Sequence, residues 1–258
     1  MVDTLVVAAC QHEPVPGDVR ANLGSAVALV EKAADQGAQL VVLPELFNTG
    51  YYMFALFRQL AEPRDGPSTG VLKELARRKG ITMVAGIAER DDIDLLYNTA
   101  VIVSPRGLEG HYRKAHLWDK EGEMFEPGNN PPVLATSLGY LAVLVCYDLE
   151  YPEAAEEVRR LGARLLAAPA AFGNEALWVA TITARAKELE IPVVAANRVG
   201  LEGDTRFCGR SMVLDGKGNV LADAGHDEGI ALAEVELPEV ARRPAPARDT
   251  RFISPEFG

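Results

Sequence analysis

The hydrophobic positions along this 258-residue chain follow two alternating periodicities. Short apolar runs, typical of buried strands, alternate with longer stretches in which apolar residues recur at helical spacing. The first unit is a strand at residues 5–10, a helix that begins after Asp18 and ends at Gly37, and a strand at 40–43. The pattern therefore predicts strand–helix–strand units from the start of the chain.

The rest of the chain continues this alternation and adds hairpins. A helix at 69–79 leads into a strand at 82–88, and residues 105–107 join strands at 99–103 and 108–112 as a hairpin. The second half is predicted to contain strands at 140–145, 165–168, 193–196, 211–214, 220–222 and 230–235, with helices at 152–161 and 177–189. This order indicates a layered α/β protein with a mixed sheet.

Two segments interrupt the pattern. Residues 114–132 are rich in Pro, Gly and Asn and lack periodicity, and long loops of this kind are often functional. Residues 245–258, with two prolines and two phenylalanines, predict an extended C-terminal tail suited to packing on a partner subunit. Because no linker or shift of composition divides the chain, we expect one domain over residues 1–258.

Charge and cysteine content narrow the class of protein. A net charge of −11 argues against nucleic acid as a partner. Cys10, Cys146 and Cys208 are widely spaced and have no metal-ligand spacing with the four histidines, and such sparse cysteines favour a reducing compartment. The N-terminus lacks the features of a secretory signal, and no apolar run approaches the ~18 residues that span a bilayer. We therefore expect a cytoplasmic protein with no membrane partner and no bound metal.

Cys146 carries the strongest chemical signal. It follows the apolar run 141–145, and Pro152 then predicts the first turn of a helix. A cysteine at such a strand-to-helix junction can present its sulfur to a cleft, where a hydrolase places a nucleophile. On position alone, an inert, buried cysteine is the more common case.

Two further residues share this placement. Glu45 follows the strand at 40–43, and Lys114 follows the strand at 108–112. Ligands of open α/β sheets bind beside the carboxyl ends of strands, so these groups could converge with Cys146 on one cleft. His12 and His116 also lie near strand ends and offer a Cys–His dyad as an alternative, although nothing in the sequence links either of them to the cysteine.

The three motifs together resemble those of the nitrilase, or carbon–nitrogen hydrolase, superfamily, whose signature is a Glu-Lys-Cys triad. The matching segments are Leu43-Pro44-Glu45-Leu46-Phe47, Tyr112-Arg113-Lys114-Ala115-His116-Leu117 and Val145-Cys146-Tyr147-Asp148-Leu149, supported by Tyr97-Asn98-Thr99-Ala100, Val193-Val194-Ala195-Ala196-Asn197 and Gly209-Arg210-Ser211-Met212. The resemblance extends from about Val6 to Gly229. It implies a four-layer α-β-β-α sandwich with two mixed β-sheets that dimerises through helices.

The resemblance also implies roles for individual residues and no cofactor. Cys146 would be the nucleophile and Glu45 the general base, while Lys114 and the backbone N–H of Tyr147 would stabilise the oxyanion. Glu121 matches a second glutamate of the family that orients the lysine or the substrate, although the sequence alone does not separate it from Glu123. The candidate pocket residues, chosen by their proximity to the motifs, are Tyr51, Trp118, Phe125, Ala171 and Phe172.

The residues after Cys146 resemble the amidase branches of the family, and the Trp-Glu pair common in true nitrilases is absent. We therefore expect hydrolysis of a small aliphatic amide, an ω-amide or an N-carbamoyl compound to a carboxylic acid and ammonia. Three alternatives stay open: nitrile hydrolysis by the same triad, a non-catalytic binding or regulatory protein on this scaffold, and a redox protein using Cys146 with Cys10 or Cys208.

Overall fold

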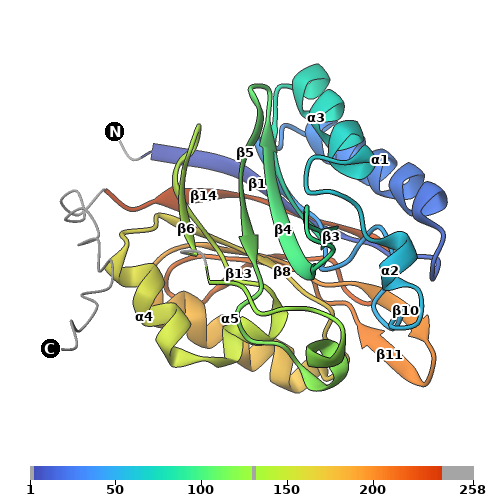
Figure 1. Cartoon of the computed structure of the whole chain (residues 1–258). Helices are drawn as coiled ribbons and strands as arrows, with labels where there is room; N and C mark the ends of the chain where they lie inside the picture. Colours follow the sequence, from blue (N-terminus) through green and yellow to red (C-terminus); the bar gives the residue numbers. More distant parts are fainter. Residues whose placement is uncertain (1–2, 130–131, 240–258) are drawn as a thin grey trace, which may run out of the picture.

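The computed structural model describes residues 3–129 and 132–239, and the predicted tail at 245–258 lies outside them. Two six-stranded sheets form the framework (Figure 1). The first has the strand order β14-β1-β2-β3-β4-β5, with β1, β2 and β3 parallel and the other pairs antiparallel. Its strands are β1 (Asp3–Gln11), β2 (Leu40–Val42), β3 (Thr82–Arg90), β4 (Leu96–Ser104), β5 (Gly107–Arg113) and β14 (Gly229–Leu237).

The second sheet has the order β13-β12-β9-β8-β7-β6, with β7, β8 and β9 parallel. Its strands are β6 (Val133–Thr136), β7 (Gly139–Val143), β8 (Leu165–Pro169), β9 (Val193–Ala196), β12 (Met212–Leu214) and β13 (Val220–Asp223). A separate hairpin consists of β10 (Val199–Glu202) and β11 (Thr205–Cys208).

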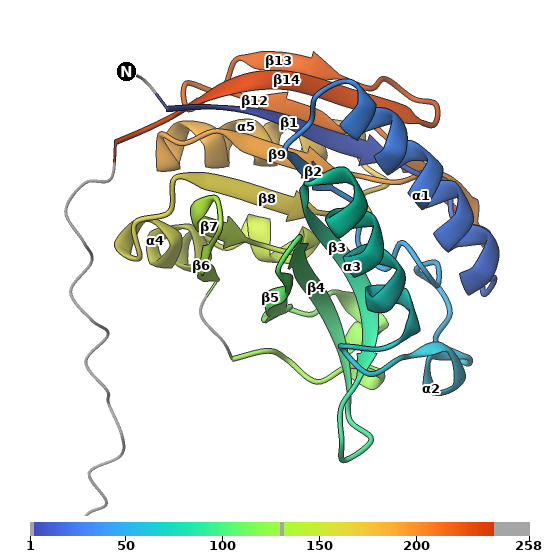
Figure 2. The same ribbon diagram turned by 90° about the horizontal axis from the view of Figure 1, so that it is seen from above.

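The sheets pack face to face, and helices cover both outer faces (Figure 2). Helices α1 (Val19–Asp35) and α3 (Pro67–Lys79) lie on the first sheet, and α4 (Pro152–Arg160) and α5 (Glu175–Leu189) lie on the second. In β1 this arrangement follows from the alternation of side chains: Val7 joins the core between the sheets, and Ala8 joins the core under α1 and α3. The predicted four-layer sandwich with two mixed sheets is confirmed.

Several predicted element ends agree with the local chemistry. The Asp18 carboxylate accepts a hydrogen bond from the Ala21 N–H at 3.0 Å and caps α1, and Gly80 ends α3 in the left-handed conformation at φ 71°. The short helix α2 (Phe57–Leu60), strand β6 and the β10–β11 hairpin were not predicted. Polar and glycine residues interrupt the apolar positions in the hairpin, so its periodicity is too short to recognise.

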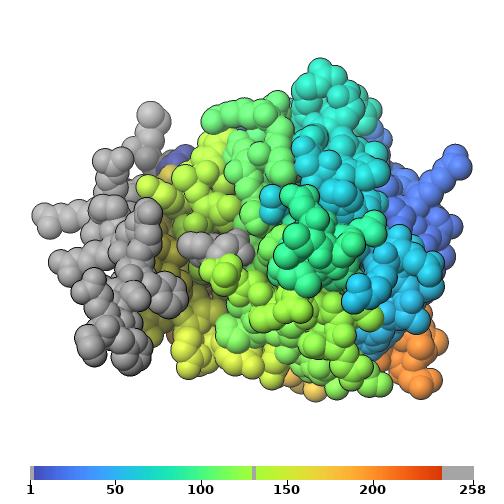
Figure 3. Space-filling view, in the orientation of Figure 1, coloured from blue at the N-terminus to red at the C-terminus, as the bar shows by residue number. Residues whose placement is uncertain are grey.

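The loop after β5 packs along the edge of the first sheet and contains the short 3₁₀ helix η1 (Asp119–Glu123). In the space-filling view, the cyan and green segments of the first half form most of one face, and the yellow-green loop lies along their lower edge (Figure 3). None of the helices in the described ranges is long and apolar enough to cross a membrane.

Candidate active site

Glu45 lies just past the end of β2, at the carboxyl edge of the first sheet. Its side chain is completely buried, although a buried carboxylate is costly unless it is paired. Gly86 on β3 allows the backbone to reach this position, since a Cβ there would lie only 2.6 Å from the Glu45 Cα. The glycine is therefore required by the close approach of two backbone segments.

Lys114 follows β5 directly and points at this carboxylate. Its Nζ lies 2.7 Å from Glu45 Oε1 and 2.8 Å from Glu121 Oε2, and all three side chains are at most 1% exposed. Glu121 comes from η1, whose single turn buries Glu121 and leaves Glu123 exposed. The cluster is thus one buried ammonium held between two carboxylates.

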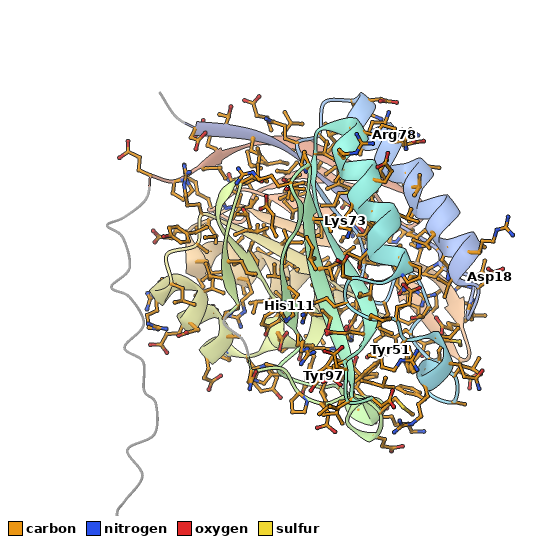
Figure 4. All side chains as sticks on the ribbon, turned by 45° about the horizontal axis from the view of Figure 1, so that its top comes forward. Asp18, Tyr51, Lys73, Arg78, Tyr97 and His111 are labelled. Carbon is orange, nitrogen blue, oxygen red and sulfur yellow. The ribbon has the colours of Figure 1, made fainter. Side chains whose placement is uncertain are left out.

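Asn98 on β4 completes this cluster, and sequence reasoning had given it no role. Its Nδ2 donates to Glu45 Oε1 at 2.7 Å and to Glu121 Oε1 at 3.0 Å, so one amide bridges the two carboxylates. In the sequence, the only indication that Asn98 could belong to the site was its place in the segment Tyr97-Asn98-Thr99-Ala100. In Figure 4, Tyr51 and Tyr97 lie low in the view, and Lys73 and Arg78 on α3 lie higher.

Cys146 comes from the second sheet, just after β7, and begins the short 3₁₀ helix η2 (Cys146–Glu150). Its φ of 49° is uncommon for a residue with a side chain, as at the strained turn that presents a nucleophile in other hydrolases. The backbone N–H of Ala171, which follows β8, is among the groups that lower the pKa of Cys146. The groups of the site thus come from both sheets: Glu45 and Lys114 follow strands of the first, and Cys146 follows a strand of the second.

Burial governs the protonation of these groups. Burial raises the pKa of Glu45, and the charge of Lys114 only partly offsets this effect. Burial alone would lower the pKa of Lys114, but the charges of Glu45 and Glu121 outweigh it and raise that pKa well above its ordinary value. Burial, followed by the charge of Glu45, raises the pKa of Cys146, so the resting sulfur is a thiol that needs a base.

One oxygen of Glu45 is available to be that base. Within the described residues, Oε2 makes no conventional hydrogen bond, whereas Oε1 is shared by Lys114 and Asn98. The Cys146 thiol is among the groups that lower the pKa of Glu45 by hydrogen bonding. Among these residues, Glu45 Oε2 is thus a buried carboxylate oxygen without a partner, on a residue whose pKa and that of Cys146 affect each other.

Asp148 ties the cysteine turn to the lysine loop. Its buried carboxylate accepts hydrogen bonds from the Val145 N–H at 3.1 Å and the His116 N–H at 2.9 Å, and His116 Nδ1 lies 2.8 Å from it. Tyr112 also hydrogen-bonds to it. Asp148 therefore fixes the segment after β7 against the segment after β5.

A cavity of about 210 Å³ opens in front of Cys146. Of the sequence-predicted residues, Tyr51, Trp118, Tyr147, Ala171 and Phe172 line it. Phe125 does not; it is buried against Phe57, with ring centroids 4.7 Å apart. The cavity also contains Tyr52, Thr205 and Phe207, of which the last two come from the β11 strand that was not predicted.

The aromatic wall of this cavity is held by a buried ion pair. Glu202 on β10 accepts hydrogen bonds from the Tyr51 N–H at 3.1 Å and the Tyr52 N–H at 2.7 Å. It pairs with Arg198, whose guanidinium also lies over the Phe207 ring, 4.1 Å from its centroid. Burial, followed by the charges of Glu45 and Glu121, raises the pKa of Tyr51, so this wall is electrostatically coupled to the carboxylate cluster.

The alternative partners of Cys146 lie elsewhere. His12 Nε2 contacts Ser25 Oγ at 2.6 Å, and the His116 ring stacks on Tyr151 with centroids 3.7 Å apart. Among the described residues, neither histidine has a hydrogen bond to the Cys146 sulfur. All three cysteines are free thiols, and within residues 3–129 and 132–239 no group of three or more His, Cys, Asp or Glu side chains could hold a metal ion.

The chain matches the carbon–nitrogen hydrolase family over residues 6–245. It is 38% identical to a protein named nitrilase from Pyrococcus abyssi over 90% of this chain and 89% of that one. It is 35% identical to omega-amidase NIT2 from Danio rerio, covering 85% and 84% of the two chains. Among solved structures, an amidase from Nesterenkonia sp. superimposes with a TM-score of 0.83 at 31% identity over 90% of each chain. Saccharomyces cerevisiae Nit3, a member of the nitrilase superfamily, gives a TM-score of 0.83 at 32% identity over 96% and 97%. The chain therefore belongs to the carbon–nitrogen hydrolase family.

Proposed function

We propose that this enzyme hydrolyses a small, non-peptide amide to a carboxylic acid and ammonia through a thioester on Cys146. The observation that carries the proposal is the buried ion pair of Glu45 with Lys114, which leaves the second carboxylate oxygen of Glu45 without a partner in the described part of the chain, in a cluster whose charges act on the pKa of Cys146. A solvated thiol, with a pKa of ~8.5, is already mostly protonated at neutral pH, and burial and the charge of Glu45 raise the pKa of Cys146 further, so this thiol requires a proton acceptor.

In the first half-reaction, the Cys146 proton passes to Glu45 Oε2 as the sulfur attacks the amide carbon. The carbonyl oxygen becomes an oxyanion, which accepts hydrogen bonds from Lys114 Nζ and from the backbone N–H of Tyr147. An ammonium has three donors, and the two carboxylates leave one for this oxygen. Glu45 then gives its proton to the departing nitrogen, the C–N bond breaks, and ammonia leaves behind a thioester.

In the second half-reaction, water attacks the thioester carbon and gives its proton to Glu45. The same oxyanion donors stabilise the second tetrahedral intermediate, whose C–S bond then breaks. The carboxylic acid leaves, and Glu45 returns the proton to the thiolate. Glu121 and Asn98 touch Lys114 and Glu45 and keep both in place throughout, so they act as positioning residues.

The preference for an amide is supported by relatives. The solved structures of the Nesterenkonia amidase include one in complex with butyramide and one with the acetamide moiety of fluoroacetamide added covalently at the active-site cysteine. A cavity of about 210 Å³ in this enzyme is suited to acyl groups of that size.

Cys146→Ala tests the proposal. It should fold normally and lose at least ~10⁴-fold in ammonia release from butyramide, because removing a nucleophile abolishes the covalent path. Cys208→Ala is the matched control, since Cys208 is a free, half-buried thiol that lies outside the cavity lining, and it should keep its activity. Mass spectrometry after incubation with fluoroacetamide should find one adduct, on Cys146. Undiminished hydrolysis by Cys146→Ala would exclude this function.

A second candidate, nitrile hydrolysis, is favoured by the relative from Pyrococcus abyssi that is named nitrilase. The same thiol could attack a nitrile carbon, with proton delivery to nitrogen. Butyramide and butyronitrile assayed side by side separate the two functions, and we expect the amide to react faster.

We also propose that the enzyme is a homodimer that pairs through α5. The outer face of this helix presents small side chains in a shallow hollow that a second helix could fill: Ala176, Val179, Ala180, Thr183 and Ala184. Sedimentation of the wild type and of Ala180→Glu checks this proposal, because a buried charge at the centre of the hollow should give monomers. A wild-type monomer would refute it.

A further inference from the structure

Within the described residues, the cavity in front of Cys146 is lined by a negatively charged group and by no positively charged one. Among its described lining residues, Glu150 alone has an ionisable carboxylate, and none is Lys, Arg or His. The remaining lining residues are aromatic, aliphatic, small or neutral polar: Tyr51, Tyr52, Trp118, Tyr147, Ala171, Phe172, Gly173, Asn174, Leu177, Thr205 and Phe207. The cavity therefore offers a substrate many apolar contacts and one negative charge.

The Glu150 carboxylate has no partner within the described residues. It ends η2, four positions after the nucleophile on the same short helix, and it is half-buried. Burial raises the pKa of its carboxyl, and no cation offsets this shift. Arg185, which donates to the carbonyl of the preceding Leu149 at 2.6 Å, pairs with Glu188 instead. Glu150 thus faces the cavity as an uncompensated acceptor.

The buried lysine of the site does not change this balance. Lys114 is enclosed by Glu45 and Glu121, so its charge is already neutralised within the cluster. A carboxylate at the distal end of an acyl chain would lose water without gaining a cation and would lie near a like charge. A distal ammonium would instead meet an acceptor of opposite charge.

We propose that the cavity selects amides whose acyl chain carries no negative charge, with a distal amine bound by Glu150, and that Glu150 excludes acyl carboxylates. The inference rests on the amide hydrolysis proposed above and names its substrate class. The cavity should therefore favour aliphatic and ω-amino amides over ω-amides of dicarboxylic acids.

Three substrates of similar length test this proposal: pentanamide, 4-aminobutanamide and succinamate. In 4-aminobutanamide an ammonium replaces the terminal methyl group of pentanamide, so the two differ in charge and little in size. For the wild type we expect kcat/KM to fall in the order 4-aminobutanamide, pentanamide, succinamate, with the first at least ~100-fold above the last.

Glu150→Gln should reduce the ratio of 4-aminobutanamide to succinamate at least ~tenfold, mainly through KM, because it removes the charge and keeps the shape. Glu156→Gln is the matched control, since it removes the same charge from an exposed position on α4 and should keep the ratio within about twofold. A ratio unchanged by Glu150→Gln, or a wild type that prefers succinamate, overturns the inference and leaves amide hydrolysis intact.

If none of the three amides is hydrolysed, the proposed function fails, and binding then decides the inference separately. Calorimetry with Cys146→Ala measures affinity without turnover. Tighter binding of 4-aminobutanamide than of succinamate, lost in Cys146→Ala/Glu150→Gln, supports the selectivity. Equal binding of the two compounds, or tighter binding of succinamate, overturns it.

Discussion

The candidate active site joins two regions of opposite character. The carboxylate cluster of Glu45, Lys114, Glu121 and Asn98 is fully buried, charged and densely hydrogen-bonded, and its parts come mainly from strand ends of one sheet. The cavity before Cys146 is lined mainly by aromatic and other apolar side chains, which come from loops, η2, α5 and β11. In the proposed mechanism this difference corresponds to two tasks: the cluster would govern proton transfer for any substrate, and the cavity would govern which substrate enters.

Substitution in the cluster should have the largest effect. Lys114→Met removes an oxyanion donor, so kcat should fall at least ~10²-fold for every amide tested. It also leaves two carboxylates buried without their cation, which costs about 3–5 kcal/mol when a buried pair is broken. Steady-state kinetics and thermal unfolding measure the two effects.

Lys120→Met is the matched control, because Lys120 is exposed on the same loop. If Lys114→Met changed KM for one substrate and spared kcat, the division between cluster and cavity would be wrong.

Adding a charge to the cluster should have a smaller but more specific effect. Asn98→Asp would replace a donor to Glu45 and Glu121 with a third acidic group. A like charge disfavours ionised Glu45 and raises its pKa further, so the acid limb of the kcat/KM profile should move to higher pH. In the wild type that limb should already lie above the ordinary glutamate range near 4.3, because burial raises the pKa of Glu45.

Asn98→Ser, which adds no charge, should lower kcat about tenfold with a smaller shift of the acid limb. Profiles of the wild type and both variants over pH 4–9 provide the measurement. Coincident acid limbs would show that Glu45 is not the titrating base.

A change in the wall of the cavity should have the smallest effect on kcat. Glu202→Gln weakens the acceptor of the Tyr51 and Tyr52 N–H groups and leaves Arg198 buried without its counter-charge. We expect a lower unfolding temperature and a KM raised about tenfold, with kcat changed by less than about threefold.

The double variant Arg198→Met/Glu202→Gln should recover much of the lost stability, because no charge remains buried, while KM stays high. Recovery of KM along with stability would indicate that the ion pair serves the fold and has no separate role in shaping the cavity.

The same division explains what could be predicted from the sequence. Glu45, Lys114 and Cys146 each follow an apolar run, and strand ends are legible in a single sequence. Asn98 was not assigned, because its reach to Glu45 depends on the pairing of β4 with β3, which places Asn98 opposite Ala88. Glu121 could be separated from Glu123 only by the turn of η1, which no periodicity reveals.

The cavity was less predictable for a physical reason. Glu202 binds the Tyr51 N–H across 151 positions of sequence, and contacts of that range depend on the complete tertiary structure. Of the residues chosen for their proximity to a motif, Tyr51 and Trp118 line the cavity, whereas the Phe125 ring packs against Phe57. Local sequence therefore indicates the chemistry better than it indicates the specificity.

The Asp148 carboxylate, which joins the turn after β7 to the loop after β5, links the two sheets, and this link bears on the order in which the chain folds and becomes active. In the proposed mechanism each sheet alone holds an incomplete set of reacting groups, so a chain with only one sheet formed would be inactive. Regain of hydrolysis during refolding would therefore follow the docking of the two sheets, and would come later than the recovery of secondary structure. The time course of recovered activity would therefore report when the two sheets dock during refolding.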